Sequence, residues 1–160
     1  YTNGVLHNGS HLLDLARFLF GEVKSVKGYS SISDHGKADP SVTGFATFQD
    51  CPEFTLMAGD ERQYAIFELE ILAEKKRIRF ENFGQELVMQ DAVNDPLFKG
   101  FKALSKRKTT ATKLVDAMPE LYRHAVEVLD KKKSSRSSLA DAIKTQTACF
   151  RLLESISSKK

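Results

Sequence analysis

Two histidines and an aspartate stand close together near the start of the sequence, at His7, His11 and Asp14. An imidazole has an unperturbed pKa of about 6.5, so it can accept or release a proton near neutral pH. Asp14 lies one helical turn beyond His11, where its carboxylate could orient the imidazole or stabilise the charged form. The residue types and their spacing therefore suit general acid–base chemistry.

Two other interpretations fit the same spacing, and spacing alone leaves all three open. Histidines at i and i+4 on a helix form a zinc-binding pattern. Against a metal site, His7 lies before the expected helix, and no glutamate completes the metalloprotease pattern. The remaining interpretation is a helix-capping turn in which His11 is incidental and Asp14 is exposed. We expect no metal site here.

An amphipathic helix is expected to position these residues. Asn8 and Ser10 suit its start, because their side chains accept hydrogen bonds from the free amides of a first turn. Apolar residues then recur at the spacing of a buried helical face, at Leu12, Leu15, Ala16 and Leu19. Gly21 ends the helix.

The middle of the chain alternates apolar and polar residues, which is typical of strands. Val42, Gly44, Ala46 and Phe48 alternate with Thr43, Phe45 and Thr47. The clearest alternation is over residues 65–73, where residues 65, 67, 69, 71 and 73 are apolar. We expect strands over residues 23–33, 42–48, 54–58, 65–73, 77–81 and 86–90. Their short connections favour antiparallel pairing. Residues 91–116 are expected to form an irregular arm.

Two further helices are expected after the arm. Pro119 suits a first helical turn, in a helix that ends near Leu129. The last helix is expected to reach about Ser157, with a stripe at Leu139, Ile143, Thr147, Phe150 and Leu153. The order of elements predicts an α+β fold: residues 1–160 form a single domain with one open, mostly antiparallel β-sheet and helices packed on one face. If Phe45 or Ile66 lines the other face, a partner chain or domain is expected to cover it.

The composition excludes several classes of protein. The chain has 160 residues, of which 41% are hydrophobic and 28% charged, enough to form a core. The net charge is +3, and the basic runs at residues 106–108 and 131–133 lack interleaved aromatic residues, so we expect no nucleic-acid partner. Cys51 and Cys149 lie far apart, which favours neither a disulfide nor a zinc site and indicates the cytoplasm. We also expect no membrane partner, since no apolar stretch approaches the roughly 20 residues of a membrane span.

The start of the chain resembles a known family. Residues 4–14 (GVLHNGSHLLD) and 20–23 (FGEV) are similar to the segment that opens the C-terminal domain of the glucose–fructose oxidoreductase/inositol dehydrogenase/MocA family. There a glycine-led turn brings a histidine, two apolar residues and an aspartate, and the helix ends at an apolar residue and a glycine. Residues 138–147 (SLADAIKTQT) and 153–155 (LES) resemble the last helix of that domain. The resemblance covers most of the chain in the order of its elements.

The resemblance implies an enzyme of two domains, a Rossmann domain that binds NAD or NADP and this open-sheet domain, which contacts a sugar or nucleotide-sugar substrate. His11 matches the catalytic histidine, which would exchange a proton with a sugar hydroxyl, and Asp14 would support it. Many members have an aspartate where this chain has His7, so a paired Asp/His scheme does not carry over. His7, Asn8 and Tyr1 are candidate substrate contacts. For Tyr1 and Asn8, packing and capping are equally good interpretations.

The part that would hold the cofactor is missing from the sequence. No G-x-G-x-x-G motif follows a strand, and the family's catalytic lysine belongs to the Rossmann domain. Since the chain starts at Tyr1 without a methionine, we expect it to belong to a longer protein. We expect this chain alone to bind no dinucleotide and to be inactive, and to self-associate through its sheet face. The alternative function is a non-catalytic oligomerisation or binding module of the same fold.

Overall fold

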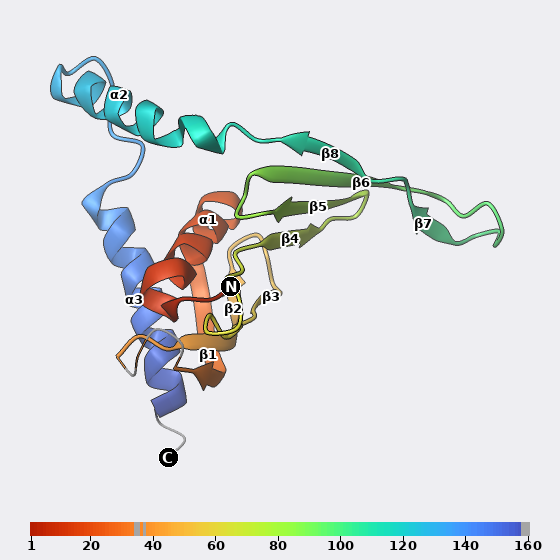
Figure 1. Ribbon diagram of the computed structural model, residues 1–160, viewed down its shortest axis with the longest axis horizontal. Helices are drawn as coiled ribbons and strands as arrows, with labels where there is room; N and C mark the ends of the chain where they lie inside the picture. The colour runs from red at the N-terminus through yellow and green to blue at the C-terminus, as the bar shows by residue number, and fades with distance from the viewer. Residues whose placement is uncertain (34–35, 37, 158–160) are drawn as a thin grey trace. The chain divides into compact units, whose positions relative to one another are not determined.

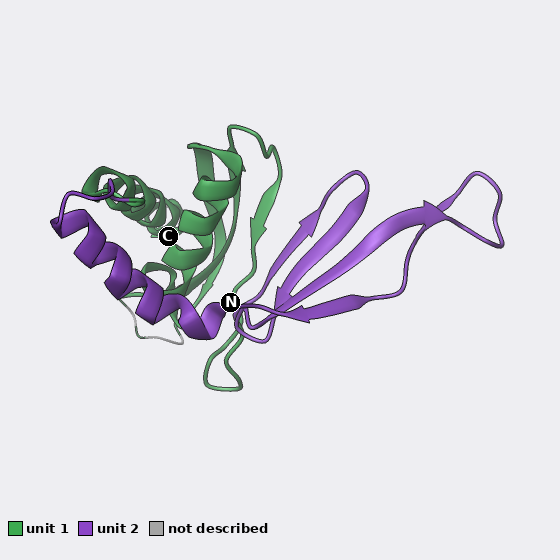
Figure 2. Ribbon diagram, turned by 90° about the horizontal axis from the view of Figure 1, so that it is seen from above, with its two compact units in different colours: residues 1–66, 136–160 green, residues 67–135 purple. Residues whose placement is uncertain are grey.

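The computed structural model describes residues 1–33, 36 and 38–157. The chain folds as two compact units, where the sequence predicts one domain. Unit 1 comprises Tyr1–Ile66 and Arg136–Lys160, and unit 2 comprises Phe67–Ser135 (Figure 2). That the whole chain serves as one substrate-binding domain stays a prediction.

Unit 1 is a small antiparallel sheet with helices on one face (Figure 1). Its elements are the π-helical turn η1 (Gly4–Gly9), α1 (Ser10–Phe20), β1 (Val23–Ile32), β2 (Ser41–Phe48), β3 (Phe54–Leu56) and α3 (Leu139–Ser157). The strands are ordered β1-β2-β3, with α3 packed on β1 and against α1.

The core of unit 1 lies between the sheet and these helices, and β2 supplies much of it. Val42, Ala46 and Phe48 are buried, as the alternation in the sequence predicts. The Phe48 ring meets the Phe54 ring of β3 edge to face, with centroids 5.2 Å apart. Phe45 points to the opposite face of the sheet and is 55% exposed. The period-two pattern of a half-buried strand therefore holds in β2 from Val42 to Phe48.

Glycines in the sheet let α3 approach the backbone closely. A Cβ atom on Gly28 of β1 would lie 2.5 Å from Ile156 Cγ2 and 2.8 Å from the Leu152 carbonyl oxygen. A Cβ atom on Gly44 of β2 would lie 2.8 Å from Leu152 Cδ1. The Gly28 amide also donates to Ser155 Oγ at 2.5 Å. These contacts fix which face of α3 is buried.

The predicted apolar stripe of α3 is wrong. The buried residues are Thr145, Ala148, Cys149 and Leu152. Leu139, Ile143 and Phe150 are exposed instead. The glycines of β1 and β2 admit Leu152 and Ile156 of α3 at close range, so the fit between the helix and the sheet decided which face of α3 is buried. In α1, Leu12 and Ala16 are buried as predicted, but Leu13 and Arg17 complete the buried face in place of Leu15 and Leu19.

Unit 2 contains a second sheet, of five strands. Its elements are β4 (Leu69–Leu72), β5 (Lys76–Glu81), β6 (Glu86–Asn94), β7 (Lys102–Leu104), β8 (Lys108–Ala111), the 3-10 turn η2 (Leu114–Asp116) and α2 (Ala117–Leu129). The strand order is β4-β5-β6-β7, and β8 also pairs with β6. All these pairs are antiparallel. The region predicted as an irregular arm thus contains β7, β8 and the end of β6.

The two faces of this sheet differ in chemistry. The register places Leu69 opposite Phe80, and Phe80 opposite Leu87. The next row pairs Ile71 with Ile78, and Ile78 with Met89. These residues form one apolar face, defined by Leu69, Ile71, Ile78, Phe80, Leu87 and Met89. The opposite face carries ion pairs, among them Arg79 with Glu81 and Arg107 with Glu81.

The predicted α+β class with antiparallel strands is confirmed, and the helices of unit 1 pack on one face of their sheet. The strands are divided between two sheets, where the sequence predicts one. Residues 65–68, predicted as the start of a strand, are not a strand, because Ile66 bonds with Thr2 instead of a strand partner. No helix among the described residues is long and apolar enough to cross a membrane.

Candidate functional site

The predicted histidines lie where the π-helical turn η1 runs into α1. The α-helix begins at Ser10, close to the expected start at about Asn8. Helical backbone begins earlier, at Gly4, and includes His7, which the sequence places before the helix. The side chains of His7 and His11 are both exposed. Ser10 does not cap the helix, since its hydroxyl donates to the His7 carbonyl at 2.6 Å. Single π-helical turns are rare overall, and those that occur are often found at functional sites. This junction is therefore a candidate site.

The cap of this helical segment comes from a distant loop. Asp39 accepts hydrogen bonds from the amides of Leu6, at 2.7 Å to Oδ1, and His7, at 3.2 Å to Oδ2. Ser41 Oγ accepts from the Gly4 amide at 2.9 Å. These contacts satisfy amides that a helix start leaves free. Nothing local in the sequence marks Asp39 as the cap, because it lies far along the chain.

Of the two possible substrate contacts Tyr1 and Asn8, Tyr1 is used within the fold by its side chain and Asn8 by its backbone. Tyr1 is 7% exposed. Its hydroxyl donates to the Val42 carbonyl at 3.0 Å and accepts from the Val42 amide at 2.7 Å. A Cβ atom on Gly9 would lie 3.1 Å from the Tyr1 ring. Asn8 is half-buried, and its backbone amide donates to the backbone carbonyl of Asn3 at 3.4 Å. The packing interpretation of Tyr1 thus has direct support.

Asp14 does not support His11 in the way the sequence suggests. Its Oδ1 atom accepts a hydrogen bond from Thr145 Oγ1 of α3 at 2.6 Å. Arg17 Nη1 donates to the same Asp14 oxygen at 3.4 Å and to Thr145 Oγ1 at 2.7 Å. Within the described residues, no hydrogen bond joins Asp14 to the His11 imidazole. Oδ1 of this carboxylate therefore helps to fix α1 on α3.

Arg17 is the centre of this polar cluster, and sequence reasoning missed it. Its side chain is 7% exposed and lies among three carboxylates, those of Asp14, Glu22 and Asp141. Both carboxylate oxygens of Glu22 accept a hydrogen bond from Arg17 Nη2, each at 3.2 Å. The available signal was its position, since Arg17 stands one turn after Leu13 and beside Ala16 on the buried face of α1. A charged residue at such a position usually has a buried partner.

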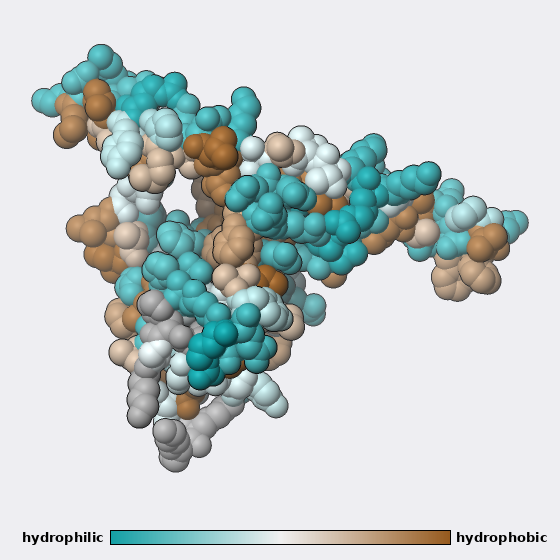
Figure 3. Space-filling model, in the orientation of Figure 1, coloured by the Kyte–Doolittle hydropathy of each residue, from teal (hydrophilic) through white to brown (hydrophobic). Residues whose placement is uncertain are grey.

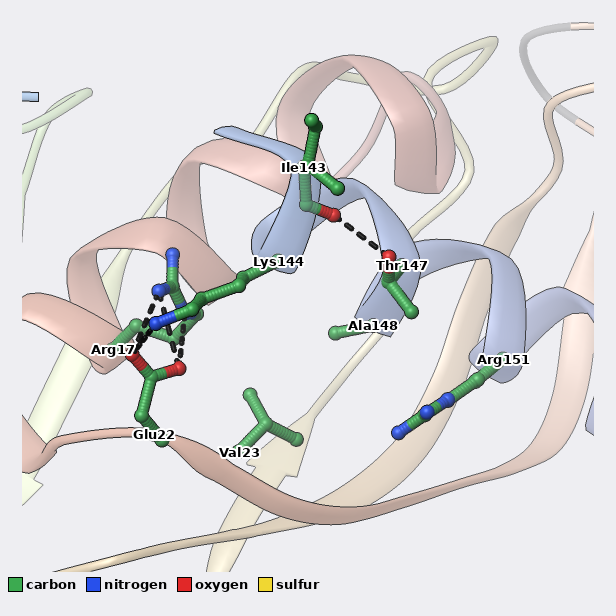
Figure 4. A pocket seen from close by; sticks show the side chains of 8 residues that line it. All are labelled: Arg17, Glu22, Val23, Ile143, Lys144, Thr147, Ala148 and Arg151. Atoms are coloured by element: carbon green, nitrogen blue, oxygen red, sulfur yellow. Dashed lines mark hydrogen bonds and ion pairs between the residues drawn. The ribbon is translucent and has the colours of Figure 1, made fainter. Parts of the chain in front are cut away.

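A pocket of about 280 Å³ opens beside this cluster. It is lined by Arg17, Glu22, Val23, Ile143, Lys144, Thr147, Ala148 and Arg151. Figure 4 shows Arg17 and Lys144 both reaching Glu22, while Arg151 extends separately from α3. The cations in the lining are thus largely engaged with a carboxylate of the same pocket.

Two carboxylates of the cluster have lowered pKa values. A hydrogen bond from Lys144, at 2.7 Å, is the main cause that lowers the pKa of Glu22, and Arg17 adds to it. Hydrogen bonds from the Ser138 side chain and backbone lower the pKa of Asp141, which caps the start of α3. Both groups are therefore held in their charged forms, as partners of the buried Arg17 require.

No metal centre is found in the described part of the chain. No group of three or more His, Cys, Asp or Glu residues there could hold a metal ion. Cys51 and Cys149 are free thiols. What the site offers chemically is two exposed imidazoles, those of His7 in η1 and His11 on the first turn of α1, in a segment that α3 and the Asp39 loop hold in place.

Comparison with protein-family models gives no match, and neither does comparison with curated proteins. Solved structures do match. A candidate NADPH-dependent oxidoreductase from Desulfitobacterium hafniense is 12% identical, with a TM-score of 0.71 over 96% of this chain and 46% of its own. UDP-N-acetylglucosamine 3-dehydrogenase GnnA from Acidithiobacillus ferrooxidans is 13% identical, with a TM-score of 0.61 over 91% of this chain and 44% of its own.

A third match is the candidate oxidoreductase YvaA from Bacillus subtilis, which is 14% identical. Its TM-score is 0.68, over 100% of this chain and 55% of its own. At such identities the likeness shows a shared fold. The chain spans about half the length of each of these structures.

Proposed function

We propose that the chain is the substrate-binding part of an NAD(P)-dependent oxidoreductase that acts on a sugar or nucleotide sugar. The observation that carries the proposal is the fold likeness, which takes in 91–100% of this chain but only 44–55% of three oxidoreductase structures. One of these is named as a nucleotide-sugar dehydrogenase. The sequence resemblance to the glucose–fructose oxidoreductase/inositol dehydrogenase/MocA family, centred on residues 4–14, supports the same proposal independently.

The cofactor would be held outside these residues. The described strands pair antiparallel and form no βαβ unit that could cradle a pyrophosphate. The chain therefore does not itself fit NAD or NADP, and its own role is to present substrate. A Rossmann domain in the full-length protein is the proposed partner.

His11 is the proposed proton-transfer residue. When a sugar hydroxyl is oxidised to a carbonyl, the hydroxyl proton passes to the His11 imidazole, and the reverse reaction returns it. Its exposure on the first turn of α1 supports this role. The carboxylate of Asp14 acts only indirectly, by holding α1 on α3. His7, exposed one turn earlier, is proposed to contact the substrate.

A non-catalytic module of the same fold is the second candidate. The observation in its favour is that no described residue donates to or accepts from the His11 imidazole, and Asp14 is engaged elsewhere. Catalytic histidines are usually oriented by a second group. In this case the chain would serve assembly or binding alone.

Self-association through a sheet face is also proposed. The face of the β1-β2-β3 sheet that α1 and α3 leave open carries Phe45, which is 55% exposed. Exposed aromatic residues on an uncovered sheet face are typical of subunit contacts. Light scattering of the full-length protein tests this, and Phe45→Ser should weaken the assembly.

The catalytic proposal is tested by His11→Ala in the full-length protein. Reduction of NAD⁺ or NADP⁺ is followed by absorbance with UDP-N-acetylglucosamine, other nucleotide sugars and free sugars. We expect turnover to fall by roughly 100-fold or more, with the circular dichroism spectrum unchanged. His7→Ala is the comparison, and should raise KM more than it lowers kcat. Wild-type turnover in His11→Ala would contradict the assignment, and a wild-type protein inactive with every sugar would favour the non-catalytic module.

The chain on its own tests whether the cofactor is bound outside residues 1–160. Titration calorimetry of residues 1–160 with NAD⁺ and NADP⁺ should give no measurable heat of binding. Binding at micromolar concentration would mean that these residues hold the cofactor, and would contradict the proposed architecture.

A further inference from the structure

The hairpin of β6 and β7 extends beyond the rest of its sheet and ends in an ordered loop. We call residues 92–104 the arm. Its strands pair Ala92 with Leu104 and Asn94 with Lys102. The loop at its end is fixed by Asp95, whose Oδ1 atom accepts from the amides of Leu97 at 2.8 Å and Phe98 at 2.9 Å. The Asp95 amide donates to the Phe101 carbonyl at 3.0 Å. The loop therefore has a defined shape.

This defined loop presents large apolar side chains to solvent. Leu97 is 83% exposed, Phe98 64% and Phe101 70%. The two rings meet edge to face with centroids 6.5 Å apart, so they form a single knob. Figure 3 shows apolar surface at the end of the arm. Ordered aromatic residues clustered at an exposed loop are the composition of an interface hot spot.

The arm cannot bury its tip on its own sheet. Met89 is the last residue of β6 on the apolar face, and β6 continues to Asn94. At about 3.3 Å per residue, that continuation carries the loop roughly 17 Å past the face. The apolar face itself has side chains that are only partly covered, and none of its six residues is fully buried. One unit thus carries both an apolar knob and an apolar surface that cannot meet each other.

We propose that the arm of one copy docks its Phe98–Phe101 knob on the apolar face of unit 2 in a second copy, and receives that copy's arm in return. This inference rests on the proposed self-association and adds a second contact, in unit 2, to the Phe45 face of unit 1. The exchange is reciprocal, as a two-fold interface requires. A phenylalanine buries on the order of 200 Å². Because Phe98 is 64% exposed and Phe101 70%, each knob has about 270 Å² left to bury, against a similar area on the surface that receives it. The two contacts together would then bury roughly 1,100 Å², just above the lower bound of about 1,000 Å² for a specific interface.

The charges around the arm favour a protein partner over an anionic lipid surface. Lys102 donates to Asn94 at 2.6 Å, and Arg107 pairs with Glu81 at 2.7 Å. Lys108 lies 3.9 Å from Asp91. These three basic residues are thus engaged with acceptors of the same sheet. Lys99 is exposed within the loop itself, a single charge where binding to an anionic membrane uses a cluster of basic residues. Peripheral membrane binding relies on cations directed at the headgroups, in addition to apolar insertion.

The first test is the oligomeric state of the full-length protein, by light scattering over a range of concentrations. The double variant Phe98→Ser/Phe101→Ser should weaken association by about 100-fold or more, because it removes the aromatic residues at both contacts. Phe18→Ser is the matched control, since Phe18 is 84% exposed on α1 in unit 1. A double variant that associates like wild type would overturn the docking of the arm and leave self-association standing. A monomeric wild type would overturn both.

The second test locates the contact by cross-linking. In a Cys51→Ser background, one copy carries Phe98→Cys and the other Met89→Cys, and the two are mixed under mild oxidation. A disulfide-linked dimer is expected. Thr109→Cys, whose strand partner Val88 lies on the opposite face from Met89, should give none. Equal cross-linking at both positions would overturn the proposal. It would also be overturned if the wild-type protein bound phosphatidylserine vesicles and the double variant lost that binding without any change in oligomeric state.

Discussion

Thr145 of α3 donates a hydrogen bond to Asp14 of α1 at 2.6 Å, and so joins two helices that are distant in the sequence. The same hydroxyl accepts a hydrogen bond from Arg17 at 2.7 Å. Thr145 is 5% exposed, so its bond with Arg17 is buried, while its bond with Asp14 is partly open to water. The orientation of α1, and with it the position of His11, therefore depends on a residue near the other end of the chain.

Replacing Thr145 by valine should destabilise unit 1 at nearly constant side-chain volume. Thr145→Val removes one acceptor for Arg17 and one donor for Asp14 in a buried place, which costs about 1–3 kcal/mol. Urea unfolding followed by circular dichroism measures the loss. Thr147→Val is the matched control, because Thr147 is exposed and its hydroxyl donates only within α3, to the Ile143 carbonyl at 2.8 Å. Equal losses in the two variants would show that the bridge to α1 contributes nothing.

The turn before α1 should not tolerate a side chain at Gly4. Gly4 has a φ of +78°, and a Cβ atom there would lie 2.2 Å from Asp39 Oδ2. Gly4→Ala would displace Asp39 and free the amides that it caps, at a cost of about 3 kcal/mol or more. Gly100→Ala isolates the backbone effect, since Gly100 has a φ of +89° and open space around it. Thermal unfolding should then show a small loss for Gly100→Ala and a large one for Gly4→Ala, and equal losses would mean that Asp39 adapts without cost.

The sequence predicts β2 well because a local period decides its structure, although the same kind of period fails over residues 65–68, which are not a strand. The alternation of β2 is reproduced because a half-buried strand must place every second residue inward, and Val42, Ala46 and Phe48 do so. Gly21 ends α1 as predicted, with a φ of +78°. The α3 stripe fails because the packed face is chosen by close approach to Gly28 and Gly44, which lie in another part of the chain.

The candidate site could be predicted only in part, and for the same reason. His7 and His11 are exposed, as residues of a helix start often are. The partners that hold the segment, Asp39 and Thr145, carry no local signal, because hydrogen bonds between distant residues leave no period in the sequence. Arg17 could have been singled out, since a charged residue on a buried helical face needs counter-charges. The exposed His11 has no such constraint, and its role rests on resemblance.

Acid should weaken the attachment of Lys144 and Arg17 to Glu22. The pKa of Glu22 is lowered from 4.5, chiefly by the hydrogen bond from Lys144. The charged form is therefore favoured in the folded state, so its contribution to stability is present above pH 4.5 and is lost as the pH falls through the lowered pKa. In Lys144→Gln, carboxyl NMR titration should show the pKa of Glu22 rising toward its usual value. Arg151→Gln, on the same helix face, should leave it unchanged, and an unshifted Glu22 in Lys144→Gln would contradict the assigned cause.

The two thiols should react at very different rates. Cys149 is fully buried, and burial raises the pKa of its thiol from 9.0 to about 12, with Asp39 adding to the effect. Only the thiolate reacts with disulfide reagents, so one thiol per native chain should react quickly, that of the partly exposed Cys51. Cys51→Ser should abolish the fast phase, and Cys149→Ser should leave it intact. Rapid labelling of both cysteines in native protein would show that α3 does not shield the Cys149 thiol.

Because the folded pKa of Cys149 is raised, its neutral thiol favours the folded state below pH 9.0, and that stability is lost as the pH rises toward 12. The urea concentration at the midpoint of unfolding should therefore fall over this pH interval, and it should fall less steeply in Cys149→Ser than in the wild type.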